Sequence, residues 1–241
     1  MKENWSVNGK DSLKAKFIEI IKSRILSGEL KPGDRLSAER SFADELKISR
    51  SSINQGILDL ERMGFVTIVP RKGTFVAQYS ERATAETLSA IMNYDSASVD
   101  PILFRDFMDL RILIERECAR LACASLTDEG LGALIKNTER ISGAGKDSIV
   151  DVLYDYHRCI TEISGNRAYY MVFQSFEKMI RNLIKEHYRS EDEFRESIPL
   201  YTDLTDAIKR RDAYDADMKM NSILGRASDY LSRRLKEEDR R

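Results

Sequence analysis

The sequence predicts a mostly α-helical protein in two parts: a small N-terminal unit of three helices and a β-hairpin, and a larger all-helical bundle. Three observations predict this fold class. Apolar residues recur at helical spacing through most of the chain. Two short β-rich runs flank a turn near residue 70, and no convincing strand follows Asp100. At 241 residues and 42% hydrophobic, the chain can build one large domain or two modest ones.

The N-terminal unit is predicted to occupy residues 1–78. A helix is expected over residues 12–27, followed by the Gly/Pro-marked connector SGELKPGDRL. A short helix is expected over residues 38–47, with Ser37 as its N-cap. A third helix begins near Ser49, and the i, i+4, i+7 spacing predicts its buried face: Ile53, Ile57 and Leu60. The runs FVTIV and TFVAQ around PRKG then predict a β-hairpin.

The rest of the chain is predicted to be helical. Residues 79–98 are expected to form a linker, and residues 99–241 an all-helical domain large enough to enclose a pocket. Polar or Gly-containing breaks such as SLTDEG, SGAGKD and SGN separate the expected helices, which are 101–125, 127–143, 147–164, 167–189, 191–211 and 213–237.

The composition says more about the cellular compartment of the protein than about its binding partner. Residues 1–80 carry 14 Lys/Arg against 10 Asp/Glu, a mild basic surplus that is informative only beside a DNA-binding motif. The three cysteines (Cys118, Cys123 and Cys159) form no Cys-x-x-Cys pair, which indicates free thiols in a reducing compartment. No apolar leader and no run of 18 apolar residues is present, so we expect a cytoplasmic protein without membrane contact.

The stretch ISRSSINQ, residues 48–55, opens the third helix with residues that favour helices poorly. Ser51, Asn54 and Gln55 lie broadly opposite the apolar side, with Arg50 at their border. Such a surface suits a helix-turn-helix whose second helix enters the DNA major groove. The alternative is an ordinary Ser49 N-cap and a merely solvated polar face. The hairpin favours the DNA-binding interpretation, because its basic tip (Arg71, Lys72 and Gly73) completes a winged helix.

Residues 25–76 resemble the DNA-binding domain of the GntR superfamily, through the spacing of PGDRL, ER, SR and KGTFV. The resemblance implies DNA contacts by the residues that match the family's motif: Arg40, Arg50, Ser51, Ser52 and Gly73. Asn54 stands where a further arginine is usual, and Gln55 where glutamate is usual. The operator is therefore expected to differ from the family's common one.

The segments DLRILIERECARLACASLTDEGL, YHRCITEISGN and DAIKRRDAYDADMKM resemble the FadR-type C-terminal domain of the same superfamily. The resemblance implies a helical domain that binds a small-molecule effector and forms a homodimer. A dimer of winged helices is expected to bind an operator with inverted-repeat symmetry.

Arg111 is predicted within an apolar stripe of the first bundle helix. A buried guanidinium needs an anionic partner. The partner is either an effector carboxylate or phosphate, or Glu115 one turn away; snorkelling to solvent is a third alternative. Tyr156, His157 and Tyr201 are further candidate effector-binding residues, although core packing is the simpler role for the tyrosines.

The resemblance also implies a metal held by an aspartate and three histidines, but the chain contains only two histidines. His157 occupies the first histidine position, while Leu153 takes the aspartate position and Tyr201 and Ile223 take the later histidine positions. We therefore predict neither a metal in this site nor another cofactor.

The sequence thus predicts an effector-controlled, dimeric transcriptional regulator, with repression as the expected output. A competing class is an enzyme built on the bundle. GAGKD at residues 143–147 lacks the spacing of a phosphate-binding loop, and no nucleophile motif is present. A second competing class is a protein-interaction bundle whose winged helix no longer reads DNA.

Overall fold

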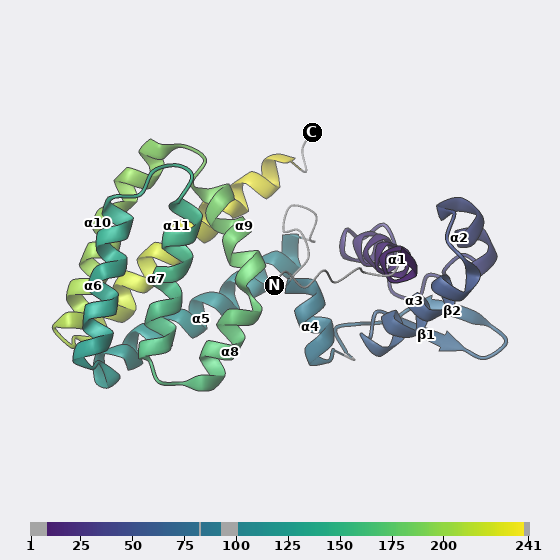
Figure 1. The fold of residues 1–241 in the computed structure, drawn as a ribbon, viewed down its shortest axis with the longest axis horizontal. Coiled ribbons are helices and arrows are strands. Elements are labelled where there is room, and N and C mark those ends of the chain that lie inside the picture. The colour runs from purple at the N-terminus through teal and green to yellow at the C-terminus, as the bar shows by residue number, and fades with distance from the viewer. Residues whose placement is uncertain (1–8, 82, 93–100, 239–241) are drawn as a thin grey trace, which may run out of the picture. The chain divides into compact units, whose positions relative to one another are not determined.

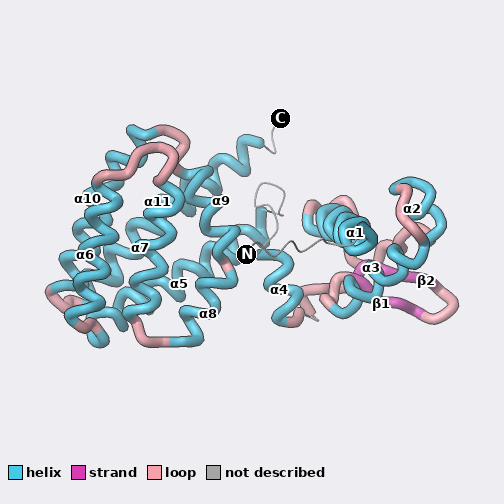
Figure 2. Tube along the Cα trace, in the orientation of Figure 1, coloured by secondary structure: helices cyan, strands magenta, loops and turns pink. Residues whose placement is uncertain are grey.

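The computed structural model describes residues 9–81, 83–92 and 101–238, which fall into two compact units. The first unit takes in the described residues as far as Met92, and the second those from Pro101 onward. The predicted mostly helical class is confirmed, because the described strands are the two of a single hairpin. Figure 2 shows these strands in magenta among the helices.

The first unit is a winged helix-turn-helix (Figure 1). Its elements are α1 (Gly9–Leu26), α2 (Glu39–Leu46), α3 (Arg50–Arg62), β1 (Val66–Val69) and β2 (Gly73–Val76). Phe17 on α1 is fully buried and meets Phe42 of α2 edge-on, with 5.4 Å between the ring centroids. Gly56 allows α3 to approach α1 closely, because a Cβ there would lie 2.5 Å from Phe17 Cδ1.

The turn between α2 and α3 positions the second helix of the motif. Helix α2 ends at Leu46, because its C-cap residue Lys47 adopts a left-handed conformation with φ of 58°. Ile48 is buried, and the Ser49 hydroxyl accepts a hydrogen bond from the Ser52 backbone N–H at 3.1 Å. Ser49 is thus the N-cap of α3, which the sequence offered as one of two alternatives, and only three residues separate α2 from α3.

The predicted cap of α2 is wrong. The N-cap residue is Ala38 rather than Ser37, and no side chain caps the helix. The reason is the strand-like backbone pairing just before the helix. The Leu36 N–H donates to the Thr74 carbonyl at 2.9 Å, and Arg35 forms an isolated antiparallel β-bridge with Phe75. This pairing holds the chain extended, so the helix begins one residue later.

The wing is a regular antiparallel hairpin with Val66 opposite Val76 and Val69 opposite Gly73. Arg71 and Gly73 both have positive φ, 64° and 117°, and they make the tight turn between the strands. A Cβ at Gly73 would meet Arg35 Nε at 3.0 Å, so the tip and the connector before α2 are in close contact.

Helix α4 (Ala85–Met92) belongs to the first unit, although its residues fall in the expected linker 79–98. Thr87 is fully buried and its hydroxyl donates to the Met63 carbonyl at 2.5 Å, while Arg62 pairs with Glu86 at 3.2 Å. The winged-helix unit therefore extends past the expected boundary at residue 78. Residues 93–98 of that linker lie outside the described residues.

Replacing Thr87 by valine tests whether α4 stabilises the winged helix. The variant keeps the shape of the side chain but removes the hydroxyl that donates to the Met63 carbonyl and accepts from the Thr84 N–H at 2.8 Å. We expect a loss of about 1–3 kcal/mol in the free energy of unfolding, measured by urea denaturation. The matched Thr67→Val variant, on half-buried β1, should change it by less than about 0.5 kcal/mol. Equal losses in the free energy of unfolding for the two variants would contradict the docking of α4 on the winged helix.

The second unit is the predicted helical bundle (Figure 1). Its helices are α5 (Pro101–Ser125), α6 (Asp128–Ser142), α7 (Ile149–Ile163), α8 (Arg167–Ser175), α9 (Glu177–His187), α10 (Glu191–Lys209) and α11 (Ala213–Glu238). Helix α5 packs along α11, and α7 lies among α5, α6, α8 and α9. The predicted single helix 167–189 is wrong, because it is interrupted at Phe176. The Phe176 ring is buried against Phe107, and its backbone leaves the α-helical region there.

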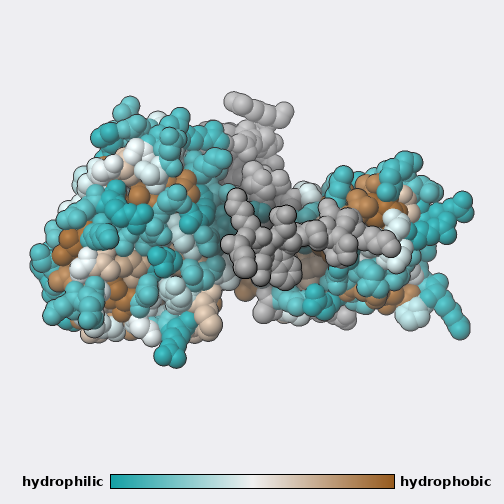
Figure 3. Space-filling model, in the orientation of Figure 1, coloured by the Kyte–Doolittle hydropathy of each residue, from teal (hydrophilic) through white to brown (hydrophobic). Residues whose placement is uncertain are grey.

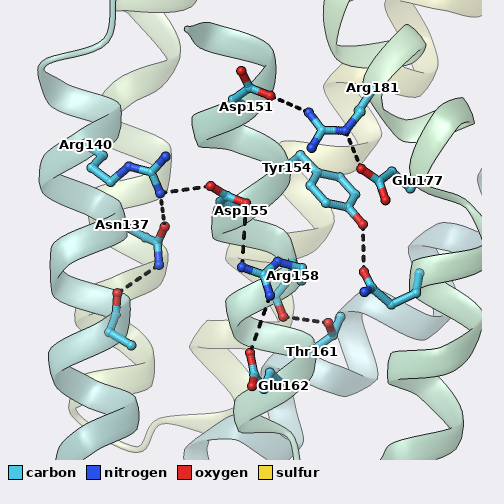
Figure 4. Close-up of polar contacts among 12 residues, drawn as sticks. Asn137, Arg140, Asp151, Tyr154, Asp155, Arg158, Thr161, Glu162, Glu177 and Arg181 are labelled. Atoms are coloured by element: carbon cyan, nitrogen blue, oxygen red, sulfur yellow. Dashed lines mark hydrogen bonds and ion pairs between the residues drawn. The ribbon is translucent and has the colours of Figure 1, made fainter. Parts of the chain in front are cut away.

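The outer side of α7 is polar (Figure 4). Asp155 pairs with Arg140 of α6 at 2.9 Å, and Asp151 pairs with Arg181 of α9 at 2.6 Å. Figure 3 shows a mainly hydrophilic surface on the displayed face of the bundle, with apolar residues in separate patches. Within the described part of the chain, no helix is both long and apolar enough to cross a membrane.

Candidate functional site

The N-terminal end of α3 presents a polar surface. Arg50, Ser51, Asn54 and Gln55 are exposed, as the sequence predicted for residues that face a ligand. Ser52 is a correction to the predicted DNA-binding set. Its side chain is buried and its hydroxyl lies 2.9 Å from the Ser49 hydroxyl, so it stabilises the helix start.

Two other elements add basic groups to the first unit. Arg40 on α2 is exposed and lies 3.9 Å from Asp44, one turn along the same helix. Arg71 and Lys72 are exposed at the tip of the wing, beside the half-buried Gly73. The wing, α2 and the start of α3 together carry the cationic and hydrogen-bonding groups that contact phosphates and base edges in winged-helix complexes.

The bundle contains a buried charged cluster formed by Arg111, Glu115 and His157. Arg111 Nε donates to Glu115 Oε1 at 2.5 Å, and Glu115 Oε2 lies 2.5 Å from His157 Nδ1. The three residues are 5%, 1% and 2% exposed. The structure thus shows the intrahelical partner for Arg111, one of the alternatives left open by the sequence. The Glu115 carboxylate contacts both Arg111 of α5 and His157 of α7, so it joins these two helices.

Burial raises the pKa of Glu115, but the charges and hydrogen bonds of Arg111 and His157 outweigh it and lower that pKa to about 2. The ionised carboxylate therefore stabilises the folded bundle.

The bundle is predicted to lose stability in acid through this carboxyl. Its pKa is lower in the folded state, about 2, than the ordinary 4.5, so the folded state holds fewer protons between these values. The stabilisation, about 3 kcal/mol, is complete above pH 4.5 and is lost as the pH falls towards 2. Urea denaturation between pH 6 and 3 measures this slope. A Glu115→Gln variant should show a shallower slope, and an identical slope would contradict the assignment.

A small pocket lies beside this cluster, with a cavity volume of about 20 Å³. Arg111, His157 and Tyr201 of the predicted effector-binding set line it, with Tyr188, Ile223 and other residues of α9 and α11. The Tyr188 and Tyr201 hydroxyls lie 3.1 Å apart. Burial raises the pKa of both tyrosines, so both present neutral hydroxyls to the pocket.

Tyr156 does not line this pocket, which corrects its predicted role. Its ring is fully buried, and its hydroxyl donates to the Tyr201 carbonyl at 3.0 Å and contacts the Thr205 hydroxyl at 2.9 Å. Tyr156 therefore fixes the distance between α7 and α10, which positions Tyr201.

His187 is a polar group in the pocket that the sequence analysis missed. Its buried Nδ1 has no hydrogen-bond partner among the described residues. Burial lowers the pKa of His187 by more than the Glu193 charge raises it, and the nearby Arg111 charge lowers it further. His187 also lines an adjoining pocket of about 180 Å³, together with Glu193, Arg226 and Tyr230. The sequence signal that could have singled out His187 is that the chain contains only two histidines.

The residues at the metal-ligand positions of the resemblance do not fit a metal. Leu153 is fully buried and has no donor atom, and Ile223 contributes only a hydrocarbon side chain to the pocket. His157 Nδ1 is already engaged by Glu115. In the described ranges, no group of three or more His, Cys, Asp or Glu side chains is arranged to hold a metal ion.

A winged helix with an exposed polar recognition helix, combined with a helical bundle that encloses a pocket, defines the class of DNA-binding transcriptional regulators. Comparison with known families agrees. Residues 13–76 match the family described as "Bacterial regulatory proteins, gntR family", and residues 106–226 match the "FCD domain". The chain belongs to the GntR family, in its FadR-type branch, and it is a transcriptional regulator rather than an enzyme.

Curated relatives are regulators of the same kind. The chain is 24% identical over 238 residues to "Uncharacterized HTH-type transcriptional regulator YcbG" of Bacillus subtilis, covering 97% of this chain and 95% of the relative. It is 25% identical over 173 residues to "Glc operon transcriptional activator" of Escherichia coli K12, covering 69% and 66%. It is 28% identical over 177 residues to "Fatty acid metabolism regulator protein" of Klebsiella pneumoniae, covering 73% and 72%.

One solved structure has the same fold. It is described as "Lar controls the expression of the Listeria monocytogenes agr system and mediates virulence", and it matches with a TM-score of 0.59 at 16% identity. The match covers 92% of this chain and 97% of the Listeria monocytogenes chain.

Proposed function

We propose that this protein is a cytoplasmic, homodimeric repressor that binds an inverted-repeat operator and whose operator affinity is set by a small anionic metabolite. The observation that carries the proposal is Arg111, a 5% exposed cation that lines a pocket in the same chain as an exposed recognition helix. Repression is the simplest output of such a unit, because occupied DNA blocks transcription without any further contact.

The effector is proposed to be an organic acid or another anionic metabolite held without a metal. Arg111 keeps further guanidinium N–H groups besides the Nε–H that it donates to Glu115, and the Tyr188 and Tyr201 hydroxyls add hydrogen-bonding groups. The hydrocarbon walls of Leu183, Ile184 and Leu224 exclude water around such an anion. Low polarity strengthens the attraction between a guanidinium and an anion.

The dimer is proposed to form through the bundle. Leu113 on α5 and Tyr214 and Met218 on α11 are 67%, 77% and 45% exposed, and these two helices pack along each other. A dimer would place two winged helices for two half-sites of opposite orientation. Ligand binding then changes operator affinity only if the ligand binds the free and the DNA-bound dimer with different affinity.

A pocket-filling variant tests the effector proposal. The protein bound to its selected duplex is titrated with a panel of small mono- and dicarboxylic acids and sugar phosphates, and the fraction bound is measured by fluorescence anisotropy. At least one anion should change the affinity of the wild type, and Ala227→Phe should abolish that response while duplex affinity without the anion is unchanged. A full response from Ala227→Phe would contradict this site, since Ala227 lines the pocket. The exposed Ala124→Phe variant on α5 is the control.

A further inference from the structure

Asn54 is held by a residue outside its own helix. Its Nδ2 donates to Glu39 Oε1 at 3.0 Å, which joins α3 to the first residue of α2. The sequence predicted Asn54 as a DNA-binding residue but gave no role to Glu39. Asn54 is exposed and Glu39 is half-buried, so the pair lies at the surface that α3 presents.

The contact fixes which way the Asn54 amide faces. An ionised carboxylate only accepts hydrogen bonds, whereas a side-chain amide has a donor end and an acceptor end. The nitrogen of Asn54 must therefore face Glu39. The amide oxygen, Oδ1, is the end left to face a base. A carboxylate has two acceptor oxygens, so Glu39 Oε2 adds a second acceptor to the pair.

This arrangement has a consequence for base recognition in the major groove. Adenine and cytosine present an amino group there, at N6 and N4, whereas guanine and thymine present acceptors at the corresponding place. Two acceptors on the protein attract an amino group and repel the O6 of guanine or the O4 of thymine. An arginine, the opposite case, donates to guanine O6 and N7.

We propose that Glu39 is a specificity-determining residue, which orients Asn54 so that this position of the operator reads adenine or cytosine and rejects guanine and thymine on the strand that Asn54 faces. The inference rests on the proposed operator binding. Glu39 acts by orienting Asn54 and by repelling the acceptor atoms of guanine and thymine. It is therefore a positioning residue and needs no base contact of its own.

Selection from a random duplex pool by the full-length protein tests this inference with three variants. Asn54→Ala identifies the position, because it should equalise all four bases there to within about twofold. In the wild type, adenine and cytosine together should exceed guanine and thymine by about tenfold at that position. Glu39→Gln should reduce this ratio to below about threefold, because a glutamine leaves the Asn54 amide free to turn its donor end to the base.

Glu45→Gln is the matched control. It removes the same charge from the same helix, but Glu45 pairs with Arg24 rather than with Asn54, so the selected sequences should equal those of the wild type. Unchanged base preferences in Glu39→Gln would overturn the inference while leaving operator binding intact. Preference for guanine or thymine at the position identified by Asn54→Ala would also overturn it. Failure of the wild type to enrich any sequence would reject the proposed function as well.

Discussion

Replacing Glu115 by glutamine is expected to lower the free energy of unfolding of the bundle by about 3–5 kcal/mol. The change keeps the size of the side chain but removes the carboxylate that faces Arg111 and His157, which are 5% and 2% exposed. A buried guanidinium is then left without its anion, and the desolvation of that charge is no longer offset. Urea denaturation monitored by circular dichroism measures the loss.

Two comparisons separate this effect from a general loss of charge. Glu117→Gln, two residues along α5, breaks only a partly exposed pair with Arg120 and should change the same free energy by less than about 1 kcal/mol. The double variant Arg111→Met with Glu115→Leu removes both ends of the buried pair, so it should recover part of the stability lost in Glu115→Gln. Equal effects of Glu115→Gln and Glu117→Gln would show that the cluster is not the main tie between α5 and α7.

Replacing Arg50 by alanine is expected to weaken specific operator binding by roughly 5- to 150-fold per half-site, the value of one bidentate contact between a guanidinium and a base. Arg50 is the first residue of α3 and is exposed, so its removal leaves the buried face formed by Ile53, Ile57 and Leu60 unchanged. Fluorescence anisotropy with the selected duplex measures the loss, and a duplex of scrambled sequence gives the non-specific affinity.

The ratio of specific to non-specific affinity distinguishes base reading from simple charge attraction. Arg195→Ala removes the same charge from an exposed site on α10 and should leave this ratio unchanged. For Arg50→Ala, the specific affinity should fall more than the non-specific one. Equal falls would assign Arg50 to the phosphates, and no fall would remove it from the DNA-binding surface.

Local patterns in the sequence were sufficient for most of the fold. The helix 101–125 was predicted with the bounds that α5 has, because the prolines and polar breaks mark helix ends. The pattern did not reveal the interruption at Phe176, because the buried Phe176 ring and its contact with Phe107 depend on a helix far away in the sequence. Ser37 failed as a cap for a similar reason, since the strand pairing of Arg35 with Phe75 is not local.

The site was predicted in its residue types but not in its contacts. Arg111, His157 and Tyr201 do line one pocket. Their partners were harder to predict. Glu115 of α5 contacts His157 of α7, which is far away in the sequence, and His187 lies on α9, whose start depends on the interruption at Phe176. The contact between Glu39 and Asn54 likewise spans 15 residues and two helices, which periodicity within one helix does not reveal.

The most direct test of the central claim is the stoichiometry and sequence of the DNA that the purified protein selects at near-physiological salt, where non-specific phosphate attraction is weakened. Selection from a random duplex pool, followed by analytical ultracentrifugation of the selected complex, gives both. The account predicts a short inverted repeat bound by two protomers, lost in Arg50→Ala. A single unrepeated site, one protomer per duplex, or no enriched sequence would contradict a dimeric, sequence-specific regulator.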